Sequence, residues 1–494
     1  MEGEICHKAN REFGLTYNNT TESKNSTLPT AAALRRALAE ARGADAMTRI
    51  RSLFDAKTFV ELSAYTKRSF HEMGSAKDAE LEGVICGYGA VGGHLVFAFA
   101  QDASRMKGAL DAAHAKKIAD LYEMAIKNGA PVVGIFDCAG ADIFEGTDAL
   151  AGYGRIMRAV SCASGRVPQI AIVSGNCIGS FAAIAAMYDF VIRTEEGKLY
   201  VNSPLLSGVS GAENTLLSYT AADDAEALAF ARKLLSFLPQ NSASGVVVEA
   251  ATDDLNRALA DMDPDADVHA FLSAIADRGD YAEVGADNAP VLVTALTSIG
   301  GVHCGILASN YTENEGRLSA AAARKAARFV SLCDAFSLPL VTLVNSCGFE
   351  ISEENEKLGF AAELGKLAMA YTTSQNAKIT VVLGHAIGGA YTLLGSKSVG
   401  ADVAYAFESA EIGTLNAASA VAFALNESIS TEISRKDLEA EWHEKLASPV
   451  AAASLGHIDD IITCAELRAR IASALFLLAA KGTAMPCRHT VNPL

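Results

Sequence analysis

The chain has 494 residues, of which 50% are hydrophobic and 20% are charged, a composition that favours compact, well-buried domains over disorder. Its 41 Lys and Arg residues against 58 Asp and Glu residues give a net charge of −17, and no dense basic stripe stands out. Nucleic acid is therefore not an expected partner.

Several features predict a soluble, cytoplasmic protein. Glycine, charged or polar residues interrupt every apolar run before it reaches the ~18 residues that cross a bilayer. The N-terminus lacks the apolar core of a secretion signal. The 10 cysteines are scattered without Cys-x-x-Cys spacing, which is typical of free thiols in a reducing compartment and gives no zinc ribbon.

The first part of the chain predicts a helical entrance followed by a hairpin. Residues 1–30, rich in Asn, Thr, Ser and Glu, are expected to be a mobile lead-in. Residues 31–59 carry helix formers and lead to the apolar run 60–62. Two strand-like runs, 81–91 and 95–100, then flank a Gly-Gly pair, which is a β-hairpin pattern.

Strand and helix patterns alternate after this hairpin. We expect a helix over 111–128, a strand over 131–137, a helix over 148–164, a strand over 168–174 and a helix opening after Gly179. Such alternation predicts an α/β fold with a largely parallel sheet and helices packed on it.

The composition changes between residues 207 and 290 to Ala, Asp and Ser, with an acidic run at 261–267. This pattern predicts a solvated interdomain linker or a surface excursion. A second hairpin pattern follows, with runs 291–299 and 302–307 around another Gly-Gly pair.

The chain repeats itself. Residues 115–140 return without a gap as residues 323–348, since 323 − 115 and 348 − 140 both equal 208, and the run 169–180 returns as 378–389. This period is far longer than the ~20–50 residues of solenoid repeats, so each copy is expected to be a whole domain. We predict an N-terminal domain over 31–250 and a C-terminal domain over 251–494.

Two glycine loops are the candidate sites for chemistry. A strand that runs into Gly-x-x-x-Gly and then a helix exposes consecutive backbone N–H groups that can hold a negative oxygen. The small residues Gly179, Ser180, Gly389 and Ala390 allow a carbonyl group to approach the main chain. Close packing of a helix on a sheet explains one such loop equally well, but two matched loops favour a functional role.

Several longer motifs resemble the carboxyltransferase subunit of biotin-dependent acyl-CoA carboxylases and decarboxylases, over roughly residue 45 to the C-terminus. They are His114-Ala-Lys-Lys-Ile, Glu145-Gly-Thr-Asp-Ala-Leu-Ala-Gly-Tyr-Gly154, Val167-Pro-Gln-Ile, Lys378-Ile-Thr-Val-Val, Ile387-Gly-Gly-Ala-Tyr391, Ser396-Lys with Gly400-Ala-Asp402, and His489-Thr-Val-Asn-Pro-Leu494. The resemblance implies two tandem crotonase-like (ClpP/crotonase) ββα-superhelix domains. It also implies an acyl-CoA side in the N-terminal domain, a biotin side in the C-terminal domain, and an active site between domains of different subunits.

The resemblance implies a role for each loop. The amides of Gly179 and Ser180 would polarise the thioester carbonyl of an acyl-CoA, propionyl-CoA or acetyl-CoA first, and stabilise its enolate. Those of Gly389 and Ala390 would do the same for the ureido oxygen of biotin, as carboxybiotin releases CO2 and the biotin anion takes the α-proton. The sequence shows no nucleophile elbow, Ser/His/Asp order or metal cluster, and this chemistry requires none.

Further substrate-binding candidates surround the loops. They are Gly140, Ala141, Lys116, Lys117, Gly348, Phe349, His385 and Tyr391. The two lysines would meet CoA phosphates, although a lysine pair on the solvent face of a helix is ordinary. The histidine would touch biotin, although a structural histidine is an equal alternative. The tyrosine is expected to pack beneath the second loop, with its hydroxyl satisfied locally.

The chain departs from the family at three places. Cys138-Ala-Gly-Ala-Asp142 stands where the family usually shows Ser-Gly-Gly-Ala-Arg, Ser180 replaces a second glycine, and Ser346-Cys-Gly-Phe-Glu-Ile-Ser-Glu-Glu-Asn355 replaces a Thr-Pro-Gly-Phe loop with its following Pro-Gly and Gln-Glu pairs. These changes bear on substrate identity more than on reaction type.

Missing motifs predict partners. The chain has no Gly-x-x-x-x-Gly-Lys-Ser/Thr loop for ATP, and Ala484-Met-Pro-Cys487 has proline where a biotin-accepting lysine would stand. Biotin would therefore arrive on a separate biotin carboxyl carrier protein, with a biotin carboxylase or a membrane decarboxylase subunit as a further partner. The resemblance implies a homohexamer, a trimer of dimers. Two alternatives stay open: the carboxyltransferase component of a sodium-pumping methylmalonyl-CoA or glutaconyl-CoA decarboxylase, and a non-catalytic scaffold paralogue.

Overall fold

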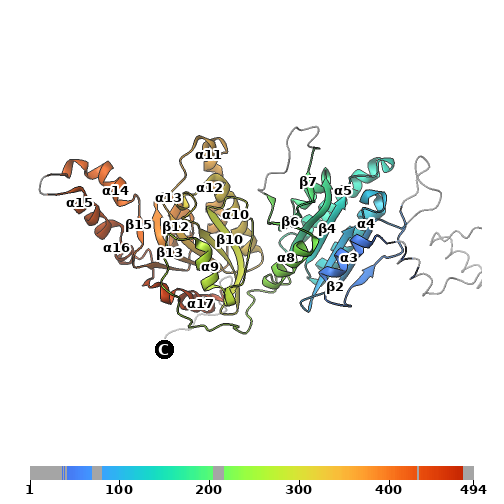
Figure 1. Ribbon diagram of the computed structural model, residues 1–494, viewed down its shortest axis with the longest axis horizontal. Coiled ribbons are helices and arrows are strands. Elements are labelled where there is room, and N and C mark those ends of the chain that lie inside the picture. Colours follow the sequence, from blue (N-terminus) through green and yellow to red (C-terminus); the bar gives the residue numbers. More distant parts are fainter. Residues whose placement is uncertain are drawn as a thin grey trace, which may run out of the picture. The chain divides into compact units, whose positions relative to one another are not determined.

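Two sheets with the same strand topology organise the chain in the computed structural model (Figure 1). The structure describes residues 36, 38, 40, 42–68, 81–203, 216–430 and 433–481. The predicted mobile lead-in, residues 1–30, and the tail motif at 489–494 lie outside these residues.

The first sheet has eight strands in the order β1-β2-β3-β4-β5-β6-β8, with β7 paired to β5. The pairs β1–β2 and β2–β3 are antiparallel, and the other pairs are parallel. The strands are β1 Val60–Leu62, β2 Val84–Val91, β3 His94–Gln101, β4 Val132–Cys138, β5 Gln169–Ile178, β6 Phe190–Thr194, β7 Lys198–Tyr200 and β8 Tyr219–Ala221.

The second sheet repeats the first, in the order β9-β10-β11-β12-β13-β14-β16 with β15 paired to β13. Its strands are β9 Tyr281–Glu283, β10 Leu292–Ile299, β11 Val302–Ser309, β12 Leu340–Ser346, β13 Lys378–Ile387, β14 Val403–Phe407, β15 Glu411–Gly413 and β16 Asp460–Ile462. Both hairpins, β2–β3 and β10–β11, are where the sequence predicts them. The strands of the two sheets span residues 60–221 and 281–462, and the domain boundary near residue 250 stays a prediction.

Helices flank both sheets. In the first module they are α3 Ala44–Leu53, α4 Ala112–Asn128, α5 Thr147–Ala163, α6 Ser180–Ala185 and α8 Asp224–Phe237. In the second they are α9 Val268–Ile275, α10 Ala320–Ala335, α11 Glu353–Lys357, α12 Phe360–Thr373, α13 Gly388–Leu393, α14 Ala417–Ala420, α15 Arg435–Trp442, α16 Pro449–Ser454 and α17 Leu467–Leu478. None of the helices in the described ranges is both long and apolar enough to span a membrane.

Equivalent helices begin with equivalent caps. The Asp111 carboxylate accepts the His114 N–H at 2.7 Å at the start of α4, and the Ser319 hydroxyl accepts the Ala322 N–H at 3.2 Å at the start of α10. These side chains satisfy amides that the first helical turn leaves without a partner. The repeat in sequence is therefore also a repeat in local structure.

Two predicted segments differ from the structure. The predicted linker over 207–290 contains α8 and α9, which bury Leu234 and Phe237, and Phe271 and Leu272, respectively. The prediction failed because Asp residues are typical of a solvated linker. Two of them, Asp223 and Asp267, are instead the N-caps of α8 and α9. The helical entrance predicted over 31–59 is shorter where described, since α3 ends at Leu53.

Candidate active site

Each module brings two loops together at the carboxyl ends of adjacent parallel strands. Cys138 at the end of β4 is paired in register with Cys177 of β5, and Ser346 at the end of β12 is paired with Ala386 of β13. The loops that follow these strands therefore begin at the same edge of each sheet, where ligands of open α/β sheets commonly bind.

The loops after β4 and β12 share one backbone conformation. The Leu110 N–H donates to the Gly140 carbonyl at 2.9 Å, and the Asp142 N–H donates to the Leu110 carbonyl at 2.8 Å. In a parallel bridge of this kind the N–H of the residue in between, Ala141, points to the opposite side. Residues 318 and 348–350 make the same bridge in the second module, which turns the Phe349 N–H outward.

The loops after β5 and β13 turn at equivalent glycines. Gly179 has φ = +61° and Gly388 has φ = +64°, and these glycines are 209 residues apart, as are the starts of their strands, since 378 − 169 = 209. A side chain at either position would be strained because L residues rarely adopt this conformation. Both glycines are therefore required by the turn itself.

The Gly179 amide is not free for a substrate, which differs from the expectation from sequence. Its N–H donates to the Tyr200 carbonyl at 3.0 Å. The amides of Ser180 and Phe181 open α6 and have no acceptor within the helix. The offset of 209 matches these two residues with Gly389 and Ala390. The prediction from sequence did not include Phe181, because it chose the amides by the position of the glycines. The hydrogen bonds that decide which amides are free are not visible in the sequence.

Phe349 and Gly389 lie against each other in the second module. A β-carbon added at Gly389 would lie 2.8 Å from the Phe349 ring, so the close approach of the ring requires glycine. Phe349 also meets Phe360 edge to face, with ring centroids 5.5 Å apart. A cavity of about 630 Å³ lies beside this pair, lined by residues 349–353, Glu356, Phe360, Ala361 and Leu364. The structure thus joins three predicted residues, Gly348, Phe349 and Gly389, in one place.

Asp142, where the family usually has arginine, is paired with an arginine from elsewhere in the chain. Arg68 donates to the Asp142 carboxylate at 2.7 Å and to the Asp111 carboxylate at 3.4 Å. Both carboxylates are buried. Burial and the neighbouring Glu82 charge raise the pKa of Asp111 to about 6. Sequence reasoning missed Arg68 because 74 residues separate it from Asp142.

A buried pair supports the start of α4 beneath this loop. His114 Nδ1 lies 3.1 Å from Glu82 Oε1, and both side chains are fully buried. Burial alone would raise the pKa of Glu82, but the hydrogen bond and charge of His114 outweigh it and lower the pKa to about 2. The histidine of the first family motif is therefore a structural partner of a carboxylate.

The predicted lysine pair is divided between surface and core. Lys116 is exposed and forms an ion pair with Asp120 at 2.5 Å. Lys117 is buried, and its Nζ donates to the Val84 carbonyl at 2.6 Å. A CoA-binding role stays a prediction for both lysines, and the buried position of Lys117 does not favour it.

The two remaining candidates lie on either side of the second glycine loop. His385 is half-buried in β13, and its ring stacks on Tyr311 with centroids 5.4 Å apart. Tyr391 is half-buried in α13 and packs against the core, and burial raises the pKa of its hydroxyl.

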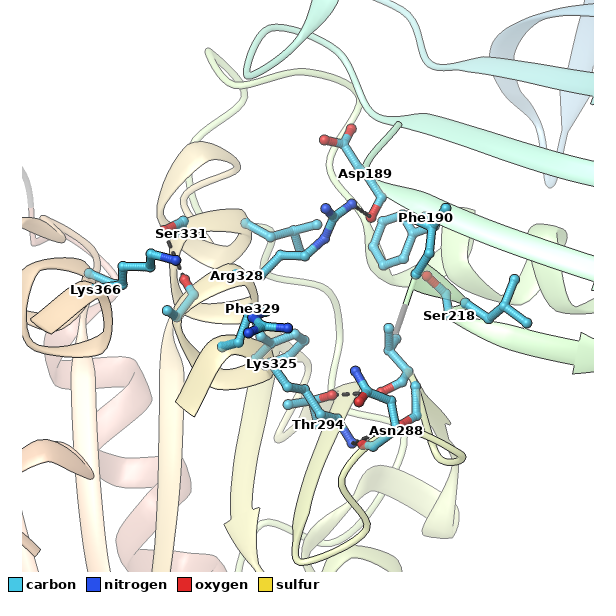
Figure 2. Close-up of a pocket in the computed structure, with 18 of the residues that line it drawn as sticks. Asp189, Phe190, Ser218, Asn288, Thr294, Lys325, Arg328, Phe329, Ser331 and Lys366 are labelled. Carbon is cyan, nitrogen blue, oxygen red and sulfur yellow. Dashed lines mark hydrogen bonds between the residues drawn. The ribbon is translucent and has the colours of Figure 1, made fainter. Parts of the chain in front are cut away.

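A second cavity of about 650 Å³ contains none of the predicted site residues (Figure 2). It lies at the start of β6 and beside α10, and its labelled residues include Asp189, Lys325 and Arg328. Lys325 Nζ donates to the carbonyls of residues 285, 288 and 292 at 2.7–2.9 Å, and burial lowers its pKa to about 8. Arg328 donates to the Tyr188 carbonyl at 2.7 Å. Lys325 and Arg328 therefore donate to backbone carbonyls of the protein itself, which is a structural role. The glycine loops remain the candidate active site.

Two tandem α/β modules with matched glycine loops define a protein of the crotonase fold, and comparison with known proteins identifies its class. The family described as "Carboxyl transferase domain" matches residues 40–492, and the chain belongs to this family. It is 34% identical over 475 residues to the methylmalonyl-CoA carboxyltransferase 12S subunit of Propionibacterium freudenreichii subsp. shermanii, covering 90% of this chain and 91% of that protein. It is also 34% identical to the methylmalonyl-CoA decarboxylase subunit alpha of Propionigenium modestum, covering 90% and 92%.

A solved structure extends the similarity to three dimensions. The transcarboxylase 12S crystal structure with hydrolysed methylmalonyl-coenzyme A bound, described as a hexamer assembly, superposes with a TM-score of 0.88 at 31% identity. The match covers 95% of this chain and 99% of that chain. The fold predicted from the sequence and the carboxyltransferase resemblance are thereby confirmed, and the chain is an enzyme of the acyl-CoA carboxyltransferase class.

Proposed function

We propose that this protein moves a carboxyl group between biotin on a separate carrier protein and the α-carbon of a short acyl-CoA, with propionyl-CoA and methylmalonyl-CoA as the leading pair. The observation that carries the proposal is the matched pair of amides that open α6 and α13, Ser180 and Phe181 in one module and Gly389 and Ala390 in the other. The names of the two relatives reported above both refer to methylmalonyl-CoA, which supports this substrate class.

The first module would receive the thioester. The Ser180 and Phe181 amides, with the outward amide of Ala141 on the neighbouring loop, would donate to the thioester oxygen as it becomes anionic. Donors held in place by the backbone need no reorganisation, and each is worth ~3 kcal/mol in comparable sites. Exposed Lys116 is the lysine of the pair that a CoA phosphate could reach.

The second module would receive biotin. Gly389 is exposed, and the Phe349 ring lies where a β-carbon of this residue would be, so its amide and that of buried Ala390 lie beside the ring. A flat urea group fits beside an aromatic ring of this kind. When bound, biotin supplies a reversible carrier for the carboxyl group. The chain's own part is to orient the urea oxygen and hold it with the two amides.

The same residues would serve the decarboxylase alternative, which the similarity to the Propionigenium modestum subunit supports. Main-chain donors stabilise the same transition state in both directions. The partners would then differ: a biotin carboxylase for carboxylation, and a membrane decarboxylase subunit for the sodium pump. A scaffold without catalysis is disfavoured because both modules form the glycine turn that precedes these amides, at Gly179 and Gly388.

We further propose a cytoplasmic hexamer that works with a biotin carboxyl carrier protein. The hexamer is supported by the similarity to transcarboxylase 12S, whose structure is a hexamer assembly. The cytoplasmic location is supported by the cysteines that the structure describes, which are all free.

The test is decarboxylation of methylmalonyl-CoA by the purified protein with free biotin. Gly389→Leu is expected to abolish it, because the leucine β-carbon would lie 2.8 Å from the Phe349 ring and force the ring away from the amides. Gly365→Leu is the matched control, since this exposed glycine of α12 has open space around its Cα. Unchanged turnover in a correctly assembled Gly389→Leu protein would refute the role of this loop.

A further inference from the structure

His385 and Glu411 form a hydrogen-bonded pair on the strand that leads into the second glycine loop. His385 Nδ1 lies 3.2 Å from Glu411 Oε2, with β13 and β15 paired in register at these two residues. The other oxygen of Glu411 accepts the Ala417 N–H at 2.9 Å, and the His385 main-chain N–H donates to Asn345 Oδ1 at 2.7 Å. Both members of the pair are therefore fixed in place by further hydrogen bonds.

This arrangement determines what the second ring nitrogen can do. An ionised carboxylate only accepts hydrogen bonds, so Nδ1 must carry a proton whether the ring is neutral or charged. Nε2 is then an acceptor in the neutral ring and a donor in the imidazolium. Among the residues that the structure describes, Nε2 makes no hydrogen bond, and 30% of the side chain is exposed.

The surroundings favour the charged ring. The hydrogen bond to Glu411 raises the pKa of His385 against the effect of burial, and the charges of Asp265 and Glu315 act in the same direction as Glu411. Tyr311 stacks on the ring, and burial raises the pKa of its hydroxyl to about 12 and also raises the pKa of the nearby Cys347 thiol. These two groups are therefore neutral. Of the charged groups around the pair, Glu411, Asp265 and Glu315 are acidic. Arg317 pairs with Glu315 at 2.6 Å and donates to the Cys347 carbonyl at 3.2 Å, and His443 acts on Glu411.

The first module lacks this pair. In register, the residues that correspond to His385 and Glu411 are Asn176 of β5 and Lys198 of β7. Neither asparagine nor lysine changes its hydrogen-bonding character near neutral pH. The pair therefore marks the one of two duplicated loops to which the proposed function assigns biotin.

We propose that His385, held by Glu411, is a pH-controlled hydrogen-bond donor for the urea oxygen of the biotin that Gly389 and Ala390 receive. The inference rests on the proposed function and deepens it. His385 would contact the ligand, and Glu411 would be a positioning residue. The donor is present below the pKa of His385 in the folded protein and is lost as the pH rises through it.

The test is calorimetric titration with biotin methyl ester, whose side chain carries no charge, across about pH 6 to 9. We expect affinity to fall on the order of tenfold over this range and binding to take up a proton at the upper end, read from buffers of different ionisation enthalpy. His385→Asn, which installs the first module's residue, should bind on the order of tenfold more weakly at low pH and show neither effect. Glu411→Gln should move the midpoint to lower pH.

His269→Asn is the matched control. His269 is also held by two carboxylates, with Nδ1 near Asp267 and Nε2 3.0 Å from Glu283, but it lies in α9. It should keep the wild-type pH dependence. If His385→Asn retains that dependence and the proton uptake, the inference is overturned. Methylmalonyl-CoA decarboxylation in the same preparations separates the two proposals. If decarboxylation is absent but biotin methyl ester binding is still linked to a proton, the result supports the role of His385 and Glu411 and counts against the proposed function. If decarboxylation occurs but binding does not depend on pH, the result counts only against the role of His385 and Glu411.

Discussion

Replacement of Arg68 by methionine tests how the acyl-CoA loop is held. Methionine keeps most of the volume of the side chain but leaves the Asp142 and Asp111 carboxylates without their shared cation. The Arg68 side chain is only 11% exposed, and those of Asp111 and Asp142 are 1% and 8% exposed. Water can therefore compensate little for the lost guanidinium.

The size of the effect follows from this burial. Removal of one partner of a buried ion pair costs ~3–5 kcal/mol. We expect about 3 kcal/mol, the low end, because the long 3.4 Å contact to Asp111 is the weaker of the two and the Asp111 carboxylate keeps its bond from the His114 N–H. The KM for methylmalonyl-CoA should rise more than kcat falls, since Asp142 directly follows the outward amide of Ala141.

Urea unfolding and steady-state kinetics measure the two effects. In a double-mutant cycle, Asp142→Asn should recover part of the stability that Arg68→Met loses, with a coupling energy of at least ~1 kcal/mol. Arg470→Met is the control, because Arg470 pairs with Asp460 at 3.1 Å but with side chains 43% and 44% exposed, and should cost less than ~1 kcal/mol. Additive losses for Arg68 and Asp142 would refute the argument that the pair holds this loop.

Two further predictions concern buried cations. Lys117→Met should destabilise the protein by ~1–3 kcal/mol, because the Val84 carbonyl loses its buried donor. Lys116→Met should change stability by no more than ~0.5 kcal/mol, because this lysine and its partner Asp120 are exposed. Equal effects of the two variants in thermal unfolding would contradict the placement of Lys117 in the core and Lys116 on the surface. Arg468→Met should cost ~3–5 kcal/mol in urea unfolding, because this fully buried arginine bonds Asp277 at 2.7 Å, and Asp277 in turn accepts the N–H groups of the β10–β11 turn at 2.8 Å. A loss below about 1 kcal/mol would show that Asp277 holds the turn without the arginine.

The sequence allowed prediction of those parts of the fold that rest on local pattern and on repetition. The alternating strands and helices of each module, both hairpins and both glycine turns have period, spacing or composition that a single chain displays. Helix α8 was missed because its apolar face is spread among Asp and Ala, and only packing shows that this face is buried. The Arg68 pair was missed for another reason: no local pattern links side chains so far apart in sequence. Whether an individual amide is free for a ligand likewise cannot be predicted from the local sequence. The Gly179 N–H is not free because it donates to Tyr200 of the neighbouring strand β7.

The glycine turns of the two modules have the same main-chain conformation but different side chains around them. The effect of a substitution on stability can therefore be separated from its effect on ligand binding. Gly179 and Gly388 have the same φ within a few degrees, and an added β-carbon would have no neighbour within 4 Å at the first and only the Thr414 carbonyl at 3.5 Å at the second. Gly179→Ala and Gly388→Ala should therefore each cost ~1–3 kcal/mol in urea unfolding, from backbone strain alone, and by nearly equal amounts. Their ligand effects should differ: the first should weaken binding of methylmalonyl-CoA and spare biotin methyl ester, and the second the reverse. Unequal folding costs would contradict the equivalence of the turns, and a shared loss of both ligands would contradict the division of the two substrates between the modules.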